Sequence, residues 1–99
     1  GAWHPGLRSQ YFPDALNNKT GILKNKRFEL DIYIPSLKRA IEFNGERWHL
    51  KYQETILRDA RKKKECKNKR IRLLTVWYND WKNNKEKIMD KCLKFLMRK

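Results

Sequence analysis

The sequence predicts an α/β domain in which a small mixed β-sheet is flanked by helices. The expected elements follow one another as strand, strand, helix, strand and helix. A helix between the second and third strands indicates a crossover, which joins two parallel strands of a sheet. A chain of 99 residues has room for one such domain.

Residues 1–26 are expected to form an irregular N-terminal segment. Pro5, Gly6 and Pro13 interrupt any regular pattern, and the run from Asn17 to Gly21 has the composition of a turn. The chain starts with Gly1-Ala2 and has no initiator methionine, so we expect a fragment of a longer protein.

The first strand is predicted over residues 28–34, where apolar and polar side chains alternate strictly. The face expected to be apolar carries Phe28, Leu30, Ile32 and Ile34. The opposite face carries Glu29, Asp31 and Tyr33. A second strand over residues 39–44 ends at Gly45, and the short gap between the two predicts an antiparallel hairpin.

A helix is predicted from about Tyr52 to Asn68, because this stretch contains no Gly or Pro and is rich in helix formers. Ile56, Leu57 and Ala60, together with Lys63 or Lys64, are expected to form its thin apolar stripe.

Residues 71–77 are predicted to form a third, mostly buried strand, and residues 78–80 a turn. The last helix is predicted from Trp81 to about Met97, where apolar side chains recur at helical spacing.

The charge balance favours a polyanionic partner. Lys and Arg number 25 and Asp and Glu number 11, which gives a net charge of +14. Such a charge destabilises a compact monomer through self-repulsion, and it attracts polyanions such as nucleic acid. There is no run of about 18 apolar residues, so no transmembrane helix is expected. Cys66 and Cys92 are too few for a disulfide scaffold or a zinc module, and we expect buried thiols in a reducing cytoplasm.

Two carboxylates are expected on neighbouring strands. Asp31 and Glu42 form a candidate site for a hard divalent cation such as Mg²⁺, and Asn44 is expected to point the same way as Glu42. A bound Mg²⁺ polarises a phosphoryl oxygen and lowers the pKa of a bound water. The alternative interpretation makes both carboxylates solvated residues on an exposed sheet face.

His49 follows the end of the second strand, and binding and catalytic sites of α/β sheets commonly lie at strand ends. A histidine there can act as general base near neutral pH, and Asp59 can orient its imidazole. The alternative is a surface histidine and a helix carboxylate paired with Arg58 or Lys63.

The predicted helix over residues 52–68 is strongly basic and can lie along a phosphate backbone without reading sequence. The expected DNA contacts are Arg47, Arg58, Arg61, Lys62 and Lys64. The alternative interpretation is an ordinary solvated face.

The order of Asp31, residues 40–49, Arg58-Asp59 and residues 71–77 resembles the very-short-patch-repair endonucleases. It is still more similar to their phage relatives, the homing endonucleases with an E-D-x-H-D active-site pattern. Both groups belong to the PD-(D/E)XK, restriction-endonuclease-like nucleases. The resemblance covers about residues 27–80.

The resemblance implies hydrolysis of phosphodiester bonds in double-stranded DNA with Mg²⁺ or Mn²⁺, in the cytoplasm of a bacterium or of a phage host. Asp31 matches the metal-binding aspartate, with Glu42 beside it. In the repair enzymes a backbone carbonyl on the second strand completes the metal site, and Phe43 occupies the matching position. His49 matches the histidine that acts on the attacking water, and Asp59 matches its acidic partner.

Three departures from the family pattern refine this expectation. Asn44 replaces the lysine of the general pattern, so the role of general base passes to His49. The family's first Glu has no counterpart in residues 1–26, and either Asp14 substitutes or that Glu belongs to a missing segment. The cysteines do not reproduce the zinc site of the repair enzymes, which favours the homing branch.

Three functions therefore stay open. The first is the catalytic domain of a homing endonuclease, which makes a double-strand break as a homodimer or by sequential nicking. Trp77, Tyr78 and Trp81 are candidates for the partner surface, with core packing as the alternative. The second is a mismatch-directed nickase that places Trp48 beside a distorted base pair. The third is a basic nucleic-acid-binding module without enzymatic activity.

Overall fold

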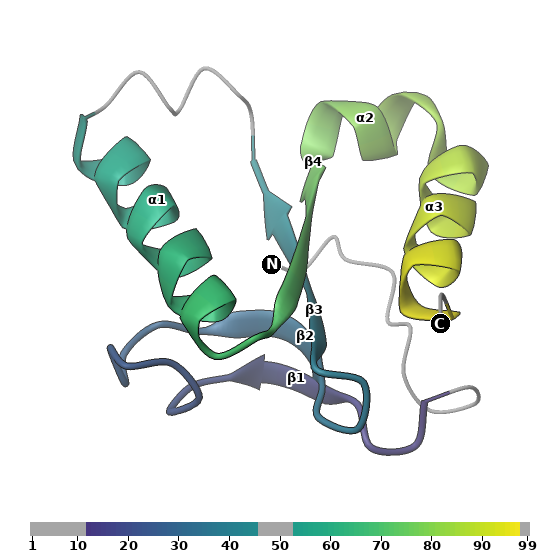
Figure 1. Ribbon diagram of the computed structural model, residues 1–99. Coiled ribbons are helices and arrows are strands. Elements are labelled where there is room, and N and C mark those ends of the chain that lie inside the picture. Colours follow the sequence, from purple (N-terminus) through teal and green to yellow (C-terminus); the bar gives the residue numbers. More distant parts are fainter. Residues whose placement is uncertain (1–11, 46–52, 98–99) are drawn as a thin grey trace.

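A computed structural model describes residues 12–45 and 53–97, apart from the side chains of residues 53–55 (Figure 1). The described residues form a small α/β fold with a four-stranded mixed sheet and three helices. None of these helices has the length and apolar content that crossing a bilayer requires.

The strands lie side by side in the order in which they occur in the sequence. They are β1 (Leu16–Lys19), β2 (Leu30–Ile34), β3 (Arg39–Asn44) and β4 (Arg72–Trp77). The pairs β1–β2 and β2–β3 are antiparallel, whereas β3 and β4 are parallel. The hairpin and the parallel pair are thus confirmed.

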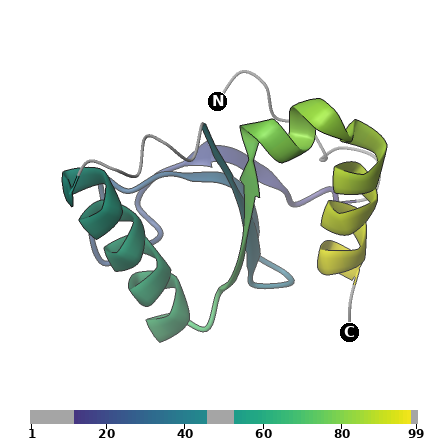
Figure 2. The ribbon, with the colours of Figure 1, turned by 90° about the horizontal axis from the view of Figure 1, so that it is seen from above.

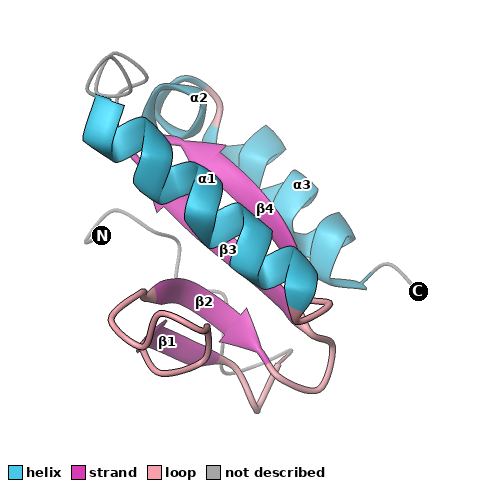
Figure 3. Cartoon of the chain, turned by 60° about the vertical axis from the view of Figure 1, so that its left-hand side comes forward, coloured by secondary structure: helices cyan, strands magenta, loops and turns pink. Residues whose placement is uncertain are grey.

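The parallel pair is connected by α1 (Gln53–Asn68), which covers one face of the sheet (Figures 1 and 2). After β4 the chain forms α2 (Tyr78–Asn83) and α3 (Lys85–Met97), and α3 covers the opposite face (Figure 3). Because both faces are covered, alternate residues of the central strands are buried in two different cores.

The two cores have distinct members. The core on the α1 side contains Leu23, Leu30, Tyr33, Ala40, Cys66 and Ile71. The core on the α3 side contains Phe12, Ile32, Ile34, Ile41, Phe43, Val76, Cys92 and Leu96. Leu30 and the neighbouring Phe28 pack on the α1 side, so the prediction that they share a face with Ile32 and Ile34 was wrong.

The predicted irregular segment over residues 1–26 contains a strand. β1 pairs its backbone with β2, with Leu16 opposite Tyr33 and Lys19 opposite Leu30. Backbone hydrogen bonding does not depend on side-chain type, so a short edge strand with two asparagines forms in spite of its turn-like composition.

The turn predicted at residues 78–80 was also wrong, because the helix α2 begins directly after β4. Trp77 has an extended backbone conformation, and Asp80 in the first turn of α2 interacts favourably with the helix dipole. Asn84, with φ −155° and ψ 69°, separates α2 from α3.

The apolar stripe predicted for the first long helix is not its buried face. In α1, Ile56 and Leu57 are 46% and 60% exposed, while Glu65 and Cys66 are buried. The buried face of α1 therefore holds a carboxylate and a thiol where large aliphatic side chains were expected.

Candidate functional site

Asp31 and Glu42 occupy opposed positions on neighbouring antiparallel strands. Ile32 of β2 pairs with Ile41 of β3, and the same register places Asp31 opposite Glu42. Directly opposed side chains lie on one face of a sheet. The sequence therefore placed these two carboxylates correctly relative to each other.

Their environment differs from the alternative interpretation, in which they were solvated. Asp31 is 8% exposed and Glu42 is 7% exposed. Glu42 has the same strand parity as Ala40, which packs in the core on the α1 side. The exposed-face interpretation was wrong because α1 covers this side of the sheet (Figure 3).

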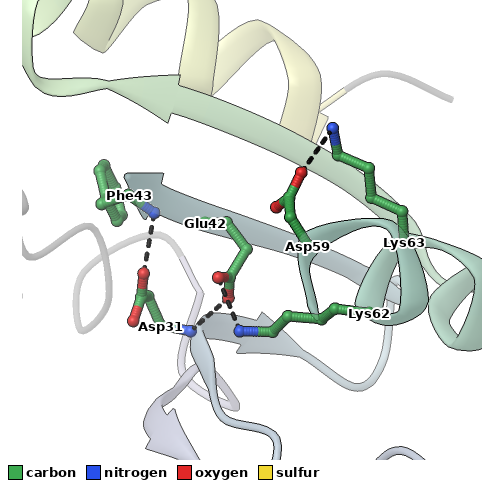
Figure 4. Close-up of polar contacts among 6 residues, drawn as sticks. All are labelled: Asp31, Glu42, Phe43, Asp59, Lys62 and Lys63. Carbon is green, nitrogen blue, oxygen red and sulfur yellow. Dashed lines mark hydrogen bonds and ion pairs between the residues drawn. The ribbon is translucent and has the colours of Figure 1, made fainter. Parts of the chain in front are cut away.

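The two carboxylates are linked through backbone amides (Figure 4). The Asp31 N–H donates to Oε1 of Glu42 at 3.2 Å, and the Phe43 N–H donates to Oδ2 of Asp31 at 2.8 Å. Like charges at opposed positions repel each other. These two N–H groups place positive ends of dipoles at the carboxylates and offset part of that repulsion.

Lys62 of α1 is the third charged member of the cluster. Its Nζ lies 2.7 Å from Oε2 of Glu42, and its side chain is only 15% exposed (Figure 4). Burial raises the pKa of the Glu42 carboxyl above its ordinary value. The hydrogen bond and charge of Lys62 oppose this rise, while the nearby Asp31 carboxylate adds to it.

The donor set suits a hard cation that keeps water ligands. Mg²⁺ is commonly bound through one or two carboxylates together with waters and substrate phosphates. Asp31 and Glu42 supply two carboxylates, but the described part of the chain contains no group of three His, Cys, Asp or Glu side chains placed to hold a metal. A cation that binds Oε2 of Glu42 has to compete with the Lys62 ammonium.

Phe43 contributes to this cluster through its backbone alone. The residue is 6% exposed, and it packs in the core on the α3 side, opposite to the carboxylates. Asn44, at the end of β3, is half-buried.

Asp59 lies on α1 three residues before Lys62, so both occupy the same side of the helix. Its Oδ2 is 3.1 Å from Nζ of Lys63 (Figure 4). Lys63 is one of the two partners named in the alternative interpretation of Asp59. The proposed partner of Asp59, His49, lies outside the described residues, as does Arg47.

Asp14 is held far from the carboxylate pair. Its Oδ2 accepts a hydrogen bond of 2.8 Å from the Ser36 N–H. Hydrogen bonds from the Ser36 side chain and then from the Ser36 backbone lower the pKa of the Asp14 carboxyl. Ser36 follows the end of β2, whereas Asp31 lies near its start. At about 3.3 Å per residue, the length of β2 keeps Asp14 from substituting for a carboxylate beside Asp31.

The four residues of α1 that were predicted to contact DNA fall into two groups. Arg58, Arg61 and Lys64 are exposed, as a surface that contacts phosphates requires. Lys62 differs from the expectation, because its ammonium binds Glu42.

The pairing of Lys62 with Glu42 was not predicted from the sequence. A signal for it exists, since Lys62 and Cys66 are four residues apart and share a helix face. Cys66 is 1% exposed, and its neighbour one turn earlier therefore also points at the sheet.

Comparison with known proteins gives no match for this chain among family models, curated proteins or solved structures.

Proposed function

We propose that the chain is the catalytic domain of a metal-dependent DNA endonuclease with the restriction-endonuclease-like fold that its sequence resembles. The observation that supports this best is the buried pair Asp31 and Glu42, which lies beneath a basic helix. Burial of two neighbouring carboxylates is costly unless they are paired. The pKa of Glu42 is raised, and perturbed pKa values are concentrated at functional sites.

The proposed chemistry is hydrolysis of a phosphodiester bond. Asp31 and Glu42 would hold Mg²⁺ or Mn²⁺, with the Phe43 carbonyl as a further oxygen ligand. The bound cation supplies positive charge where negative charge develops on the phosphate oxygens.

His49 is the proposed general base, because a neutral imidazole accepts a proton from water near pH 7. Asp59 is the proposed acidic partner that orients it.

The finer assignment is a homing endonuclease of the E-D-x-H-D type. Its substrate is double-stranded DNA in the cytoplasm of a bacterium or of a phage host. One site cuts one strand, so a double-strand break requires a homodimer or two successive cuts. Trp81 packs against the core on the α3 side, which favours the core-packing alternative for this member of the proposed partner surface.

A second candidate is a DNA-binding module without catalysis. The Lys62 ammonium at Oε2 and the Asp31 N–H at Oε1 engage both oxygens of Glu42. A carboxylate with these partners can serve a purely structural purpose, as buried charged groups in networks do.

The decisive experiment compares plasmid cleavage with DNA binding. Supercoiled plasmid is incubated with Mg²⁺ or EDTA and with the parent, Asp31→Asn, His49→Ala or Glu29→Gln. Asn keeps an oxygen that can accept the Phe43 N–H but removes the charge that a cation needs. We expect Asp31→Asn and His49→Ala each to lower cleavage at least about a hundredfold with DNA affinity nearly unchanged.

Glu29→Gln is the matched control, since Glu29 is exposed and the substitution changes the charge equally. Normal cleavage by Asp31→Asn would refute the site. DNA binding by the parent without cleavage in Mg²⁺ or Mn²⁺ would support the binding module. Preference for a mismatched over a matched duplex would instead identify a mismatch-directed nickase.

A further inference from the structure

A cationic groove lies between α1 and the loop that joins β1 to β2, residues 20–29. The groove has a volume of about 570 Å³. Its lining consists of Lys24, Asn25, Arg61, Lys64, Glu65 and Asn68. The three cations come from two separate elements of the chain, and the α1 residues recur at the i, i+3, i+4, i+7 spacing of one helix face.

The loop is built to hold Lys24 in place. Leu23 is fully buried in the core on the α1 side, whereas Lys24 beside it is exposed. Gly21, at φ +84°, donates its N–H to the Lys26 carbonyl at 3.1 Å and closes the loop. The buried Leu23 and the closing bond fix the backbone on both sides of Lys24.

Glu65 ties this loop to α1. Its Oε1 accepts the Asn25 N–H at 2.7 Å, and the residue is 9% exposed. Asn25 in turn accepts the Arg27 N–H on Oδ1 at 3.0 Å. The one carboxylate of the groove is thus bound to the neighbour of Lys24, so it orders the loop as well as reducing the positive charge.

We propose that this groove binds backbone phosphates of the duplex DNA that the candidate site would cut. Lys24, Arg61 and Lys64 supply charge, and Asn25 and Asn68 supply amide donors to phosphate oxygens. This inference rests on the proposed function. It adds the loop of residues 20–29 to the DNA-binding surface, which the basic helix alone does not include.

The distance along α1 fits such a path. Arg61 is adjacent in sequence to Lys62, which contacts Glu42 at the candidate site. From Lys62 to Asn68 the helix rises about 9 Å, at about 1.5 Å per residue. That rise equals two to three nucleotides of duplex at about 3.4 Å each. The axial distance between Lys62 and the far end of the groove thus corresponds to only a few phosphates of one strand.

The test measures binding of a duplex of about 20 base pairs by fluorescence anisotropy in EDTA, at several salt concentrations between roughly 50 and 200 mM. Lys24→Gln is compared with Lys87→Gln, an exposed lysine on α3 at the other face of the sheet. We expect Lys24→Gln to weaken binding several-fold and to reduce the salt slope by about one, while Lys87→Gln leaves the slope unchanged.

Two substitutions of Glu65 separate its charge from its tether. Glu65→Gln removes the charge but keeps an oxygen for the Asn25 N–H, so binding stays equal or becomes tighter. Glu65→Ala also removes a negative charge, yet we expect weaker binding because the loop that carries Lys24 is released. Thermal unfolding of each variant confirms that the fold is retained.

The inference is overturned if Lys24→Gln binds like Lys87→Gln, if Glu65→Ala binds more tightly than the parent, or if RNA of the same length is preferred. It is supported if binding depends on Lys24 and on the Glu65 tether. Because these measurements need no cleavage, a parent that binds through the groove but does not cut DNA contradicts the proposed function alone.

Discussion

Glu42 lies between two charges of opposite sign, the Asp31 carboxylate and the Lys62 ammonium. Burial has the largest effect on its pKa and raises it. When the pKa of an acidic group is higher in the folded than in the unfolded state, ionisation of that group destabilises the folded protein. The contribution of Glu42 to stability is therefore most favourable at pH values below its unfolded pKa. It falls as the pH rises through the raised folded value.

Lys62→Met should raise the pKa of Glu42 further, because it removes the hydrogen bond and the charge that lower this pKa in the parent. Carboxyl titration by NMR measures the change directly. As the pH rises through the folded pKa of Glu42, the free energy of unfolding should fall by more in the variant than in the parent. In an active enzyme the acidic limb of the pH–rate profile moves to higher pH.

Lys63→Met is the matched control for this prediction, since Lys63 pairs with Asp59 and is 52% exposed. It should leave the pKa of Glu42 in place. A Lys62→Met protein in which that pKa falls or stays constant would show that Lys62 does not control the ionisation of Glu42.

The relative placement of the strand carboxylates could be predicted from the sequence, and their burial could not. Alternation along residues 28–34 and the short hairpin place Asp31 and Glu42 on one face. Whether that face is covered depends on where α1 packs. The basic sequence of α1 suggests a solvated helix. In the structure, however, the Lys62 ammonium pairs with Glu42, and Cys66 packs against the sheet.

At the scale of elements, Arg39 of β3 fastens α3 to the sheet. Its guanidinium donates to the carbonyl oxygens of Phe95 at 2.7 Å and of Leu96 at 3.1 Å. It also lies 5.9 Å from the centroid of the Phe95 ring. A cation at the last turn of a helix satisfies its terminal carbonyls and interacts favourably with its dipole.

Arg39→Met should therefore lower the free energy of unfolding by about 2 kcal/mol, a typical cost for losing hydrogen bonds to a charged group. Urea denaturation measures the change. Arg72→Met is the control, because Arg72 pairs with Arg39 in the β3–β4 register but is exposed. Equal stabilities of the two variants would contradict the role assigned to Arg39.

Helices and strands with a clear sequence pattern could be predicted. A strand that forms only by pairing with another strand, and a break between two helices, could not. The alternation in β2 and the breaker-free sequence of α1 carry their own signals. β1 has none, because Asn17 and Asn18 favour turns and the strand forms only by pairing with β2. The break between α2 and α3 depends on the backbone of Asn84, whose conformation no local pattern indicates.

At the scale of the whole molecule, positive charge surrounds two apolar cores that share one sheet. The core on the α1 side includes Cys66 and the core on the α3 side includes Cys92. Burial raises the pKa of each thiol to about 11. The cores must hold the fold together against the repulsion within a chain of net charge +14.

Added KCl should consequently stabilise the free protein while it weakens DNA binding. Screening reduces repulsion among exposed lysines and arginines, since the Debye length falls from about 10 Å at 0.1 M to about 3 Å at 1 M salt. The Tm measured by calorimetry or circular dichroism is expected to rise with KCl over this range. A double variant, Lys85→Gln with Lys87→Gln, lowers the net charge from +14 to +12.

Both of these lysines are exposed in the first turn of α3, where a positive charge opposes the helix dipole. The double variant should therefore have a higher Tm than the parent at low salt and a smaller increase with KCl. A Tm that falls as KCl is added would mean that attractive exposed ion pairs, such as Lys94 with Asp90, outweigh the net repulsion. In that case the excess of positive charge would cost the folded chain little.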